Sequence, residues 1–313
     1  MYDNIDLRLS NESANADLLQ VVTPMLVNAS EHVFNDGESV SVCGTIDGLR
    51  VSVNKNNMKI KGNSICKWYL GDNFQTLTRG DTQRAIEKMS DLFHLPIDRS
   101  DMTRIDLAQN FTVKYDPSVY YRHLGNLQYF NRLEQGQGLY YNQSKKKQLV
   151  FYNKVAEYKA KGQPVPEMYQ CTNTLRYEMR YRERLREVFN MPAVTAGDLY
   201  SEPFYVGILD RWHDAYKNIN KIRNSISFDY TMVKTVRQFQ QQAILFYVLN
   251  KGGQLEALRE IEEAAKRGDI SKKQKYDLKE QIETVCKSEL LTSTSDVIEE
   301  LNKKVKEAVK YYR

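Results

Sequence analysis

The sequence predicts an α+β protein, with an antiparallel sheet first and a helical region after it. Three observations support this class. Alternating polar and apolar residues, typical of strands, recur through residues 1–97 and 98–192. An apolar period close to 3.6 marks residues 193–313 as helical. Finally, 313 residues with 41% apolar side chains suffice to fill the cores of two domains.

Residues 1–97 are expected to form a β-rich half with its own helix. Within 38–62, β-rich runs are separated by Asp47-Gly48 and Asn56-Asn57, which are typical turn pairs of an antiparallel meander. Asp81 is expected to cap the helix, and Pro96 marks its exit. This half could be a degenerate structural relative of the next unit, although no repeat is visible in the sequence. Four lysines and two aromatic residues could form a surface that binds single-stranded DNA. Alternatively, the lysines are solvated residues of the hairpins and the tryptophan belongs to the core. These residues are Lys55, Lys59, Lys61 and Lys67, with Trp68 and Tyr69 nearby.

Residues 98–192 are predicted to form a βαββαβ unit. The first strand covers 102–113 and is followed by a helix that begins at Asp116-Pro117. Strands at 138–144 and 148–154 bracket three lysines, which predicts a hairpin with a basic tip: Lys145, Lys146 and Lys147. A short helix then precedes the last strand, 172–182, where apolar and charged residues alternate strictly.

This element order is that of the ferredoxin-like split βαβ, whose strands lie 4-1-3-2. Asp106 on the first strand would then lie between Glu178 on the fourth and Tyr152 on the third, about 5 Å from each neighbouring strand. Positive charge would surround this patch and suit an anionic substrate such as a phosphodiester, and it comes from Arg104, Arg176, Arg180 and Arg182. A solvated ladder of ion pairs is the competing interpretation of the same residues.

Four segments, in this order and spacing, resemble motifs of the rolling-circle replication initiators of filamentous phages and small plasmids. They are KIKGNSICKWYLGDNFQTL, TRIDLAQNF, LYYNQSKKKQLVFYNK and LRYEMRYR. The resemblance implies an enzyme that nicks one DNA strand at an origin with a tyrosine and a divalent metal, leaves a 5′-phosphotyrosine and a free 3′-OH primer, and rejoins the strand. Two positions depart from the family pattern: Asn110 stands where relatives often have a second acid, and Asn142 where many have glycine.

The metal is expected to be Mg²⁺ or Mn²⁺, held by hard oxygen ligands. The four histidines are scattered and form no ligating pair. We expect Asp106 and Glu178 to be ligands, with Asn110 a weaker ligand or a hydrogen-bond donor. Glu157 is a reserve ligand, although a carboxylate in the first turn of a helix is also explained by the helix dipole.

Tyr152 is the predicted nucleophile among 21 tyrosines. Its strand is expected to neighbour Asp106, and its side chain shares a face with Lys154, whose ammonium could lower the phenol pKa and bind a phosphate oxygen. Tyr152 also falls at the tyrosine of the family's tyrosine-x-lysine block. Tyr140 on the outer hairpin strand is the second candidate. Alternatively, Tyr152 has only a structural role, as a strand aromatic whose hydroxyl hydrogen-bonds a neighbour.

Origin DNA is the expected partner, bound through the arginines named above and the lysine hairpin tip. No GxxxxGK[ST] loop is present, so any fuel-driven unwinding would require a host helicase. A non-catalytic nucleic-acid binder that uses an RRM-like sheet face is the alternative function. However, two acids on a phosphate-facing surface favour the enzyme, because they repel the ligand unless a cation bridges them.

Residues 193–313 are expected to form helices that either pack on the sheet or bind the origin or a partner. Net charge is +5 and the pI about 8.8, which permits nucleic-acid binding without requiring it. The four cysteines form no C-x-x-C pair and fit reduced thiols in a cytoplasm. No signal peptide and no apolar run of about 18 residues is present, so a cytoplasmic protein with no membrane partner is expected.

Overall fold

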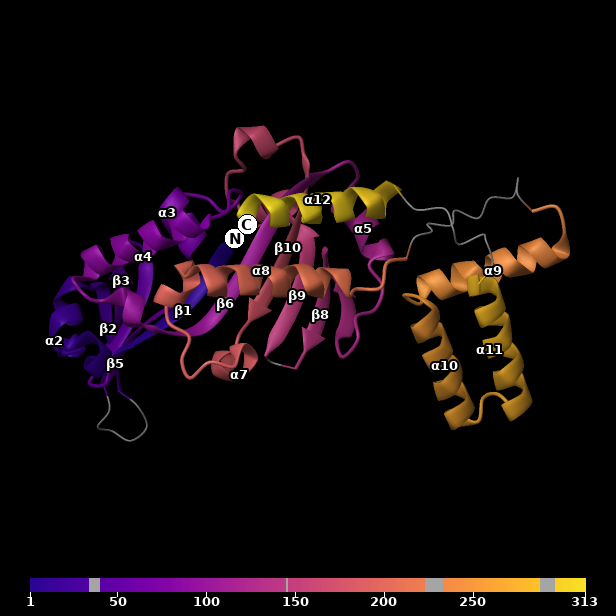
Figure 1. Ribbon diagram of the computed structural model, residues 1–313, viewed down its shortest axis with the longest axis horizontal. Helices are drawn as coiled ribbons and strands as arrows, with labels where there is room; N and C mark the ends of the chain where they lie inside the picture. Colours follow the sequence, from indigo (N-terminus) through magenta and orange to yellow (C-terminus); the bar gives the residue numbers. More distant parts are fainter. Residues whose placement is uncertain (34–39, 145, 223–232, 288–295) are drawn as a thin grey trace.

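The computed structural model describes residues 1–33, 40–144, 146–222, 233–287 and 296–313. As predicted, the fold is α+β: a large antiparallel sheet is followed by a helical C-terminal region (Figure 1). The strands are β1 (Tyr2–Ser10), β2 (Val27–Val33), β3 (Val40–Ile46), β4 (Leu49–Asn54), β5 (Asn57–Ser64), β6 (Asp101–Val113), β7 (Asn131–Gln135), β8 (Gly138–Gln143), β9 (Lys147–Asn153) and β10 (Asn173–Tyr181).

The described strands form one sheet in the order β2-β3-β4-β5-β1-β6-β10-β9-β8-β7, with every neighbouring pair antiparallel. The sheet therefore consists of two halves that meet where β1 pairs with β6. Counted outward from this junction, each half has the same order: its first strand, then its last, then its fourth, third and second. The first half is thus a structural relative of the second, which the sequence only suggested.

The strand order expected from a ferredoxin-like unit, 4-1-3-2, is wrong. In that order the first strand, β6, would lie between the fourth, β10, and the third, β9. Instead β10 lies between β6 and β9. The physical reason is that β1 of the first half occupies the edge of β6 that the third strand was expected to use. A further strand, β7, extends the outer edge and was not predicted.

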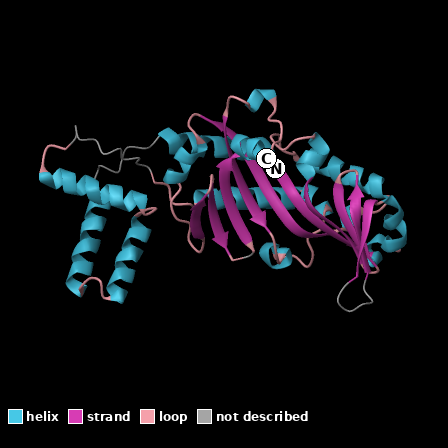
Figure 2. Cartoon of the chain, turned by 180° about the vertical axis from the view of Figure 1, so that it is seen from behind, coloured by secondary structure: helices cyan, strands magenta, loops and turns pink. Residues whose placement is uncertain are grey.

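The helices are α1 (Asn11–Ala14), α2 (Leu18–Val22), α3 (Ile65–Leu70), α4 (Arg79–Phe93), α5 (Pro117–His123), α6 (Lys154–Ala160), α7 (Leu185–Phe189), α8 (Glu202–Lys217), α9 (Val236–Asn250), α10 (Gln254–Arg267), α11 (Lys272–Lys287) and α12 (Asp296–Tyr312). The long helices α8 and α12 lie against one face of the sheet (Figure 1), and the view from behind shows the other face of the strands in front of them (Figure 2). We call these the covered face and the open face.

Alternation along each strand sends apolar side chains to the covered face. Tyr177 stacks on Phe151 of the neighbouring strand at 4.5 Å and on Trp212 of α8 at 4.8 Å, measured between ring centroids. Its hydroxyl donates to the Trp212 carbonyl at 3.1 Å. Tyr177 and Tyr181, which alternate with Glu178 along β10, are therefore in the core. The polar side chains of the same strands are left for the open face.

Local capping signals mostly specify where the helices begin and end. Asp116 accepts from the Ser118 amide and starts α5 as predicted. The capping residue of α4 is Thr78 rather than Asp81, because Asp81 occupies the third helical position and accepts a hydrogen bond from the Thr78 amide. Gly268, with φ of 82°, ends α10.

The C-terminal helices divide into two groups. Helices α8 and α12 share the main core with the sheet, through residues such as Trp212 and Leu301. Helices α9, α10 and α11 instead bury a small core of their own around Val248, Ala257 and Ile282. The expected packing of this region on the sheet is therefore correct for α8 and α12 only. Within the described residues, no helix is both long and apolar enough to cross a membrane.

Candidate active site

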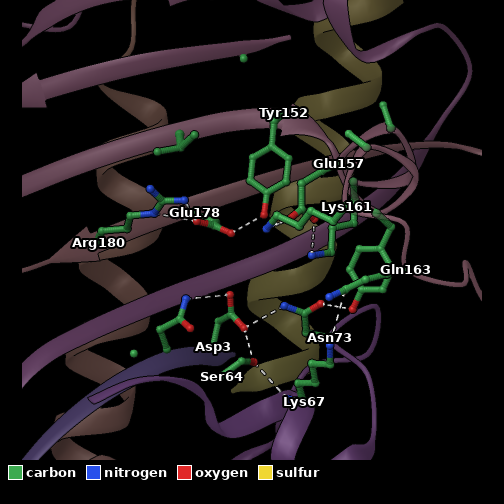
Figure 3. Close-up of a pocket in the computed structure, with 18 of the residues that line it drawn as sticks. Asp3, Ser64, Lys67, Asn73, Tyr152, Glu157, Lys161, Gln163, Glu178 and Arg180 are labelled. Carbon is green, nitrogen blue, oxygen red and sulfur yellow. Dashed lines mark hydrogen bonds and ion pairs between the residues drawn. The ribbon is translucent and has the colours of Figure 1, made fainter. Parts of the chain in front are cut away.

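A cleft of about 950 Å³ lies on the open face of the sheet, where the two halves come together (Figure 3). The first half contributes the start of β1, the end of β5 and helix α3. The second half contributes β8, β9, β10 and helix α6. Polar side chains that line it include Asp3, Ser64, Lys67, Asn73, Tyr140, Tyr152, Lys154, Glu157, Glu178 and Arg180.

Arg176 is the buried centre of the polar network beside this cleft, with 1% of its side chain exposed. Its guanidinium donates to Asp3 at 2.5 Å, to Glu178 at 2.7 Å, to the Asn73 carbonyl at 2.9 Å and to Asn110 Oδ1 at 3.1 Å. The carboxylates beside it hold its pKa well above the ordinary arginine value, although burial opposes this. One arginine thus joins strands of both halves.

Glu178 is a buried carboxylate held between two guanidinium groups. Arg176 Nε donates to its Oε1 at 2.7 Å, and Arg180 Nε donates to its Oε2 at 2.7 Å. Burial alone would raise the pKa of Glu178, but the two arginines and the Tyr152 hydroxyl lower it far below the ordinary value. The competing interpretation from sequence, a solvated ladder, is therefore only half right: the ion pairs exist, but Glu178 is 2% exposed.

Tyr152 donates its hydroxyl proton to Glu178 Oε1 at 2.6 Å (Figure 3). Burial and the adjacent Glu178 carboxylate raise the pKa of this phenol well above 10, whereas Arg176 lowers it. The Tyr152 pKa is therefore raised overall, and not lowered as the neighbouring Lys154 led us to expect. The Tyr152 hydroxyl contacts an anion, Glu178, although the register of β9 with β10 places Arg176 directly opposite Tyr152.

Lys154, the first residue of α6, is 2% exposed and donates to Glu157 at 3.0 Å. Its ammonium lies 4.5 Å from the centre of the Tyr158 ring and 5.9 Å from that of Tyr152. Burial and the neighbouring Arg176 lower the Lys154 pKa to about 8. Tyr158 donates to Asn73 Oδ1 at 2.6 Å, so it is a third cleft tyrosine beside Tyr140 and Tyr152.

Asp106 lies on the same face as Glu178 but does not neighbour Tyr152. In the register of β6 with β10, Glu178 faces Ala108 and Arg180 faces Asp106, which places the two acids diagonally. Both oxygens of Asp106 accept from Arg104, at 2.9 and 2.5 Å. Burial raises the pKa of Asp106 despite this partner.

The residues predicted to hold Mg²⁺ or Mn²⁺ do not fit a metal as they are arranged. The oxygens of Asp106 accept from Arg104, and those of Glu178 accept from Arg176 and Arg180. Among the described residues, no group of three or more histidine, cysteine, aspartate or glutamate side chains could hold a metal ion. Asn110 is also occupied, since its amide nitrogen donates to the carbonyls of residues 73 and 74. The reserve ligand Glu157 pairs with Lys154 and Lys161. The metal stays a prediction.

The residues predicted to bind DNA separate into two places. Arg180 and Arg182 lie at the open face, where both donate to Gln148 Oε1, at 3.1 and 3.0 Å. Lys147 instead points to the covered face, near the Tyr181 ring, and Lys146 pairs with Glu187 at 3.3 Å. Lys145 lies outside the described residues. Lys146 and Lys147 are therefore not free cations on a protruding turn, because one pairs with a carboxylate and the other lies near an aromatic ring.

Sequence reasoning missed Asp3, Ser64 and Asn73. Asp3 accepts from Ser64 at 2.6 Å and from the Asn73 amide at 3.1 Å, in addition to Arg176. Ser64 and Asn73 fall in the KIKGNSICKWYLGDNFQTL segment, whose resemblance to a family motif does not by itself assign roles to its residues. The sequence did not single out Asp3, because the cleft residues that it contacts, Ser64, Asn73 and Arg176, lie 61 or more residues away along the chain.

Comparison with known proteins identifies the family of the first two thirds of the chain. No curated protein matches the chain. The family model Phage_CRI, which describes the N-terminal region of a replication-associated protein, matches residues 1–202, and these include both halves of the sheet and the whole cleft. Because this match covers well over half of the chain, the protein belongs to the Phage_CRI family of replication-associated proteins, the initiators of phage rolling-circle replication.

Proposed function

We propose that this initiator nicks one strand of its origin DNA by attack of Tyr152 on a phosphodiester in the cleft, and later rejoins the strand. The observation that supports this most directly is the 2.6 Å hydrogen bond from the Tyr152 hydroxyl to Glu178. A phenol becomes a nucleophile only when a base takes its proton, and Glu178 is the acceptor already in contact.

Substrate binding would strengthen Glu178 as a base. With two guanidinium partners its pKa is too low to retain a proton from a phenol. Arg180 is the more accessible of the two, with 21% of its side chain exposed against 1% for Arg176. A phosphodiester in the cleft offers Arg180 a second anion, and any transfer of Arg180 to the phosphate raises the proton affinity of Glu178 at the moment of attack.

In the proposed reaction, the phosphate is transferred from the DNA 3′-oxygen to Tyr152. The Tyr152 oxygen forms a bond to phosphorus and its proton passes to Glu178, while the bond between phosphorus and the 3′-oxygen breaks. Lys154, with a pKa of about 8, is suited to protonate the departing 3′-oxygen. The products are a 5′-phosphotyrosine and a free 3′-OH, and the reverse reaction reseals the strand. No step is assigned to Mg²⁺ or Mn²⁺, because the oxygens predicted to bind it are paired with arginines.

The partners follow from this role. Origin DNA is the partner of a replication initiator, and the open face with Arg180 and Arg182 would receive it. Because the sequence contains no GxxxxGK[ST] loop, unwinding beyond the nick would depend on a host helicase. The alternative of a non-catalytic binder is disfavoured by the contact of the Tyr152 phenol with the buried Glu178 carboxylate, which a binding surface does not require.

The test compares three phenylalanine variants on supercoiled plasmid that carries the origin, with and without Mg²⁺. Tyr152→Phe should bind the DNA yet lose nicking by about 10³-fold or more, together with the covalent adduct. Tyr140→Phe and Tyr158→Phe are matched controls, because they change the other two cleft phenols, and both should still form the adduct. A covalent adduct recovered from Tyr152→Phe and mapped to Tyr140 or Tyr158 would assign the nucleophile elsewhere.

A further inference from the structure

A second cavity, of about 420 Å³, lies between the covered face of the sheet and helices α7 and α8. It is at the C-terminal end of β10, next to the turn that joins β8 to β9. It shares no lining residue with the cleft. The residues that line it are Gln143, Ser144, Lys146, Lys147, Tyr181, Val188 and Arg211. Three are cationic and none is acidic.

Two of these cations lack an acidic partner among the described residues. Lys146 pairs with Glu187, but no ion pair joins Lys147 or Arg211 to a carboxylate. Their recorded neighbours are aromatic rings: Lys147 Nζ lies 5.5 Å from the ring centre of Tyr181, and the Arg211 guanidinium lies 5.4 Å from that of Phe189. Burial and the nearby Arg211 both lower the Lys147 pKa.

Tyr181 provides an independent observation. It is 1% exposed, and its buried hydroxyl has no hydrogen-bond partner within the described part of the chain. A buried hydroxyl without a partner loses its hydrogen bonds to water and gains none in exchange, so native structures rarely leave one unless a ligand or water completes it. The hydroxyl belongs to a residue that lines the cavity, beside the two cations and the Ser144 side chain.

We propose that this cavity is a phosphate-binding subsite, in which Lys147 and Arg211 supply the charge and Tyr181 and Ser144 supply neutral hydrogen bonds. A phosphate group matches the site because it carries negative charge and several acceptor oxygens. Its source would be the backbone of the DNA strand on which the initiator acts, so the inference rests on the proposed function. A free phosphate is the other source of the same chemistry.

The position of the cavity suits a strand that leaves the cleft. Arg180 and Arg182 follow Glu178 on the open face at intervals of two residues, about 6.6 Å each along the strand. The Arg182 amide then donates to the Lys146 carbonyl at 2.9 Å, at the edge of the cavity. Cationic side chains therefore continue along the open face from the cleft to the end of the sheet. A DNA strand would pass around this end to place a phosphate in the subsite on the covered face, at a distance from the nick.

The test measures binding without nicking. Affinity for single-stranded oligothymidylate is followed by fluorescence anisotropy over a range of salt concentrations. The double variant Lys147→Gln, Arg211→Gln should flatten the salt dependence by about 0.7, the value for one neutralised phosphate of a single strand. Lys272→Gln, Lys273→Gln, two exposed lysines on α11, loses the same charge and should keep the wild-type slope. Tyr181→Phe should keep the slope but weaken binding about fivefold.

A second arm identifies the source of the phosphate. If inorganic phosphate raises the melting temperature of the wild type but not of the double variant, and the DNA slopes are equal, the subsite binds free phosphate. If neither the DNA slope nor the phosphate effect differs between the double variant and the α11 control, the subsite does not exist. Failure of the proposed function would appear separately, as wild-type protein that binds oligothymidylate but does not nick its origin.

Discussion

The two halves of the sheet share one strand order but only one of them carries the candidate nucleophile. In the first half, β4 passes to β5 through a tight turn, in which Asn54 Oδ1 accepts from the amides of residues 56 and 57 at 2.9 Å. In the second half, the corresponding connection between β9 and β10 contains helix α6. That insertion brings Lys154, Glu157 and Tyr158 to the cleft.

One changed connection is therefore enough for the same scaffold to position different chemistry. The equivalent last strands also differ: β5 presents Lys59, whereas β10 presents alternating arginines and a buried glutamate. Yet the first half still contributes, because Asp3 at the start of β1 neutralises Arg176. The site belongs to the junction of the halves, and paired substitutions can separate what each half supplies.

The largest stability effect is expected at the residue that joins the halves. Arg176→Met leaves the carboxylates of Asp3 and Glu178 buried without their shared partner, which should cost about 3–5 kcal/mol of unfolding free energy. Urea denaturation at pH 7 measures this cost. Lys59→Met, on the corresponding last strand of the first half, should change stability by less than about 0.5 kcal/mol. If both variants lost the same unfolding free energy, Arg176 would not be a special stabilising contact between the two halves.

A smaller effect is expected from Glu178→Gln, and it should depend on pH. The Glu178 pKa in the folded state lies far below the ordinary 4.5. Its charged form therefore stabilises the fold above about pH 4.5, and this contribution is lost as the pH falls below that value toward the folded pKa. The variant should be about 2 kcal/mol less stable than the wild type at pH 6, and the gap should narrow toward pH 3.

The control for this measurement is Glu12→Gln in the first half, where the carboxylate is exposed on α1. Its unfolding free energy should follow the wild-type pH dependence. A gap between wild type and Glu178→Gln that stays constant from pH 3 to pH 6 would mean that the Glu178 carboxylate titrates normally, and that the arginines beside it do not stabilise its charge.

The smallest effect is expected in the pH profile of nicking. Lys154 loses its proton near pH 8 instead of 10.5, so a step that needs the protonated amine should slow as the pH rises through about 8. Lys154→Arg should remove this decline, because a guanidinium stays protonated. Lys67→Arg, on the first-half side of the cleft, is the matched control and should keep it. Wild-type nicking that still accelerates at pH 9 would exclude Lys154 as the proton donor.

Features that depend on residues close together in the chain could be predicted from the sequence. Alternation placed Arg176, Glu178 and Arg180 on one face and Tyr177 on the other, because successive side chains of a strand point to opposite sides. Capping and turn residues located α5 and the hairpin of β8 and β9 for the same reason. The four motifs in order were enough to indicate the family.

Which strands pair, and which charged side chains come into contact, could be seen only in the folded sheet. Which edge a strand pairs with depends on every other strand, so nothing within 98–192 revealed that β1 would occupy one edge of β6. That pairing moved Asp106 away from Tyr152, and it brought Asp3 to Arg176 across 173 residues of sequence. The pKa of Tyr152 is accordingly raised instead of lowered, because burial and a neighbouring carboxylate are properties of the folded molecule and not of any one segment.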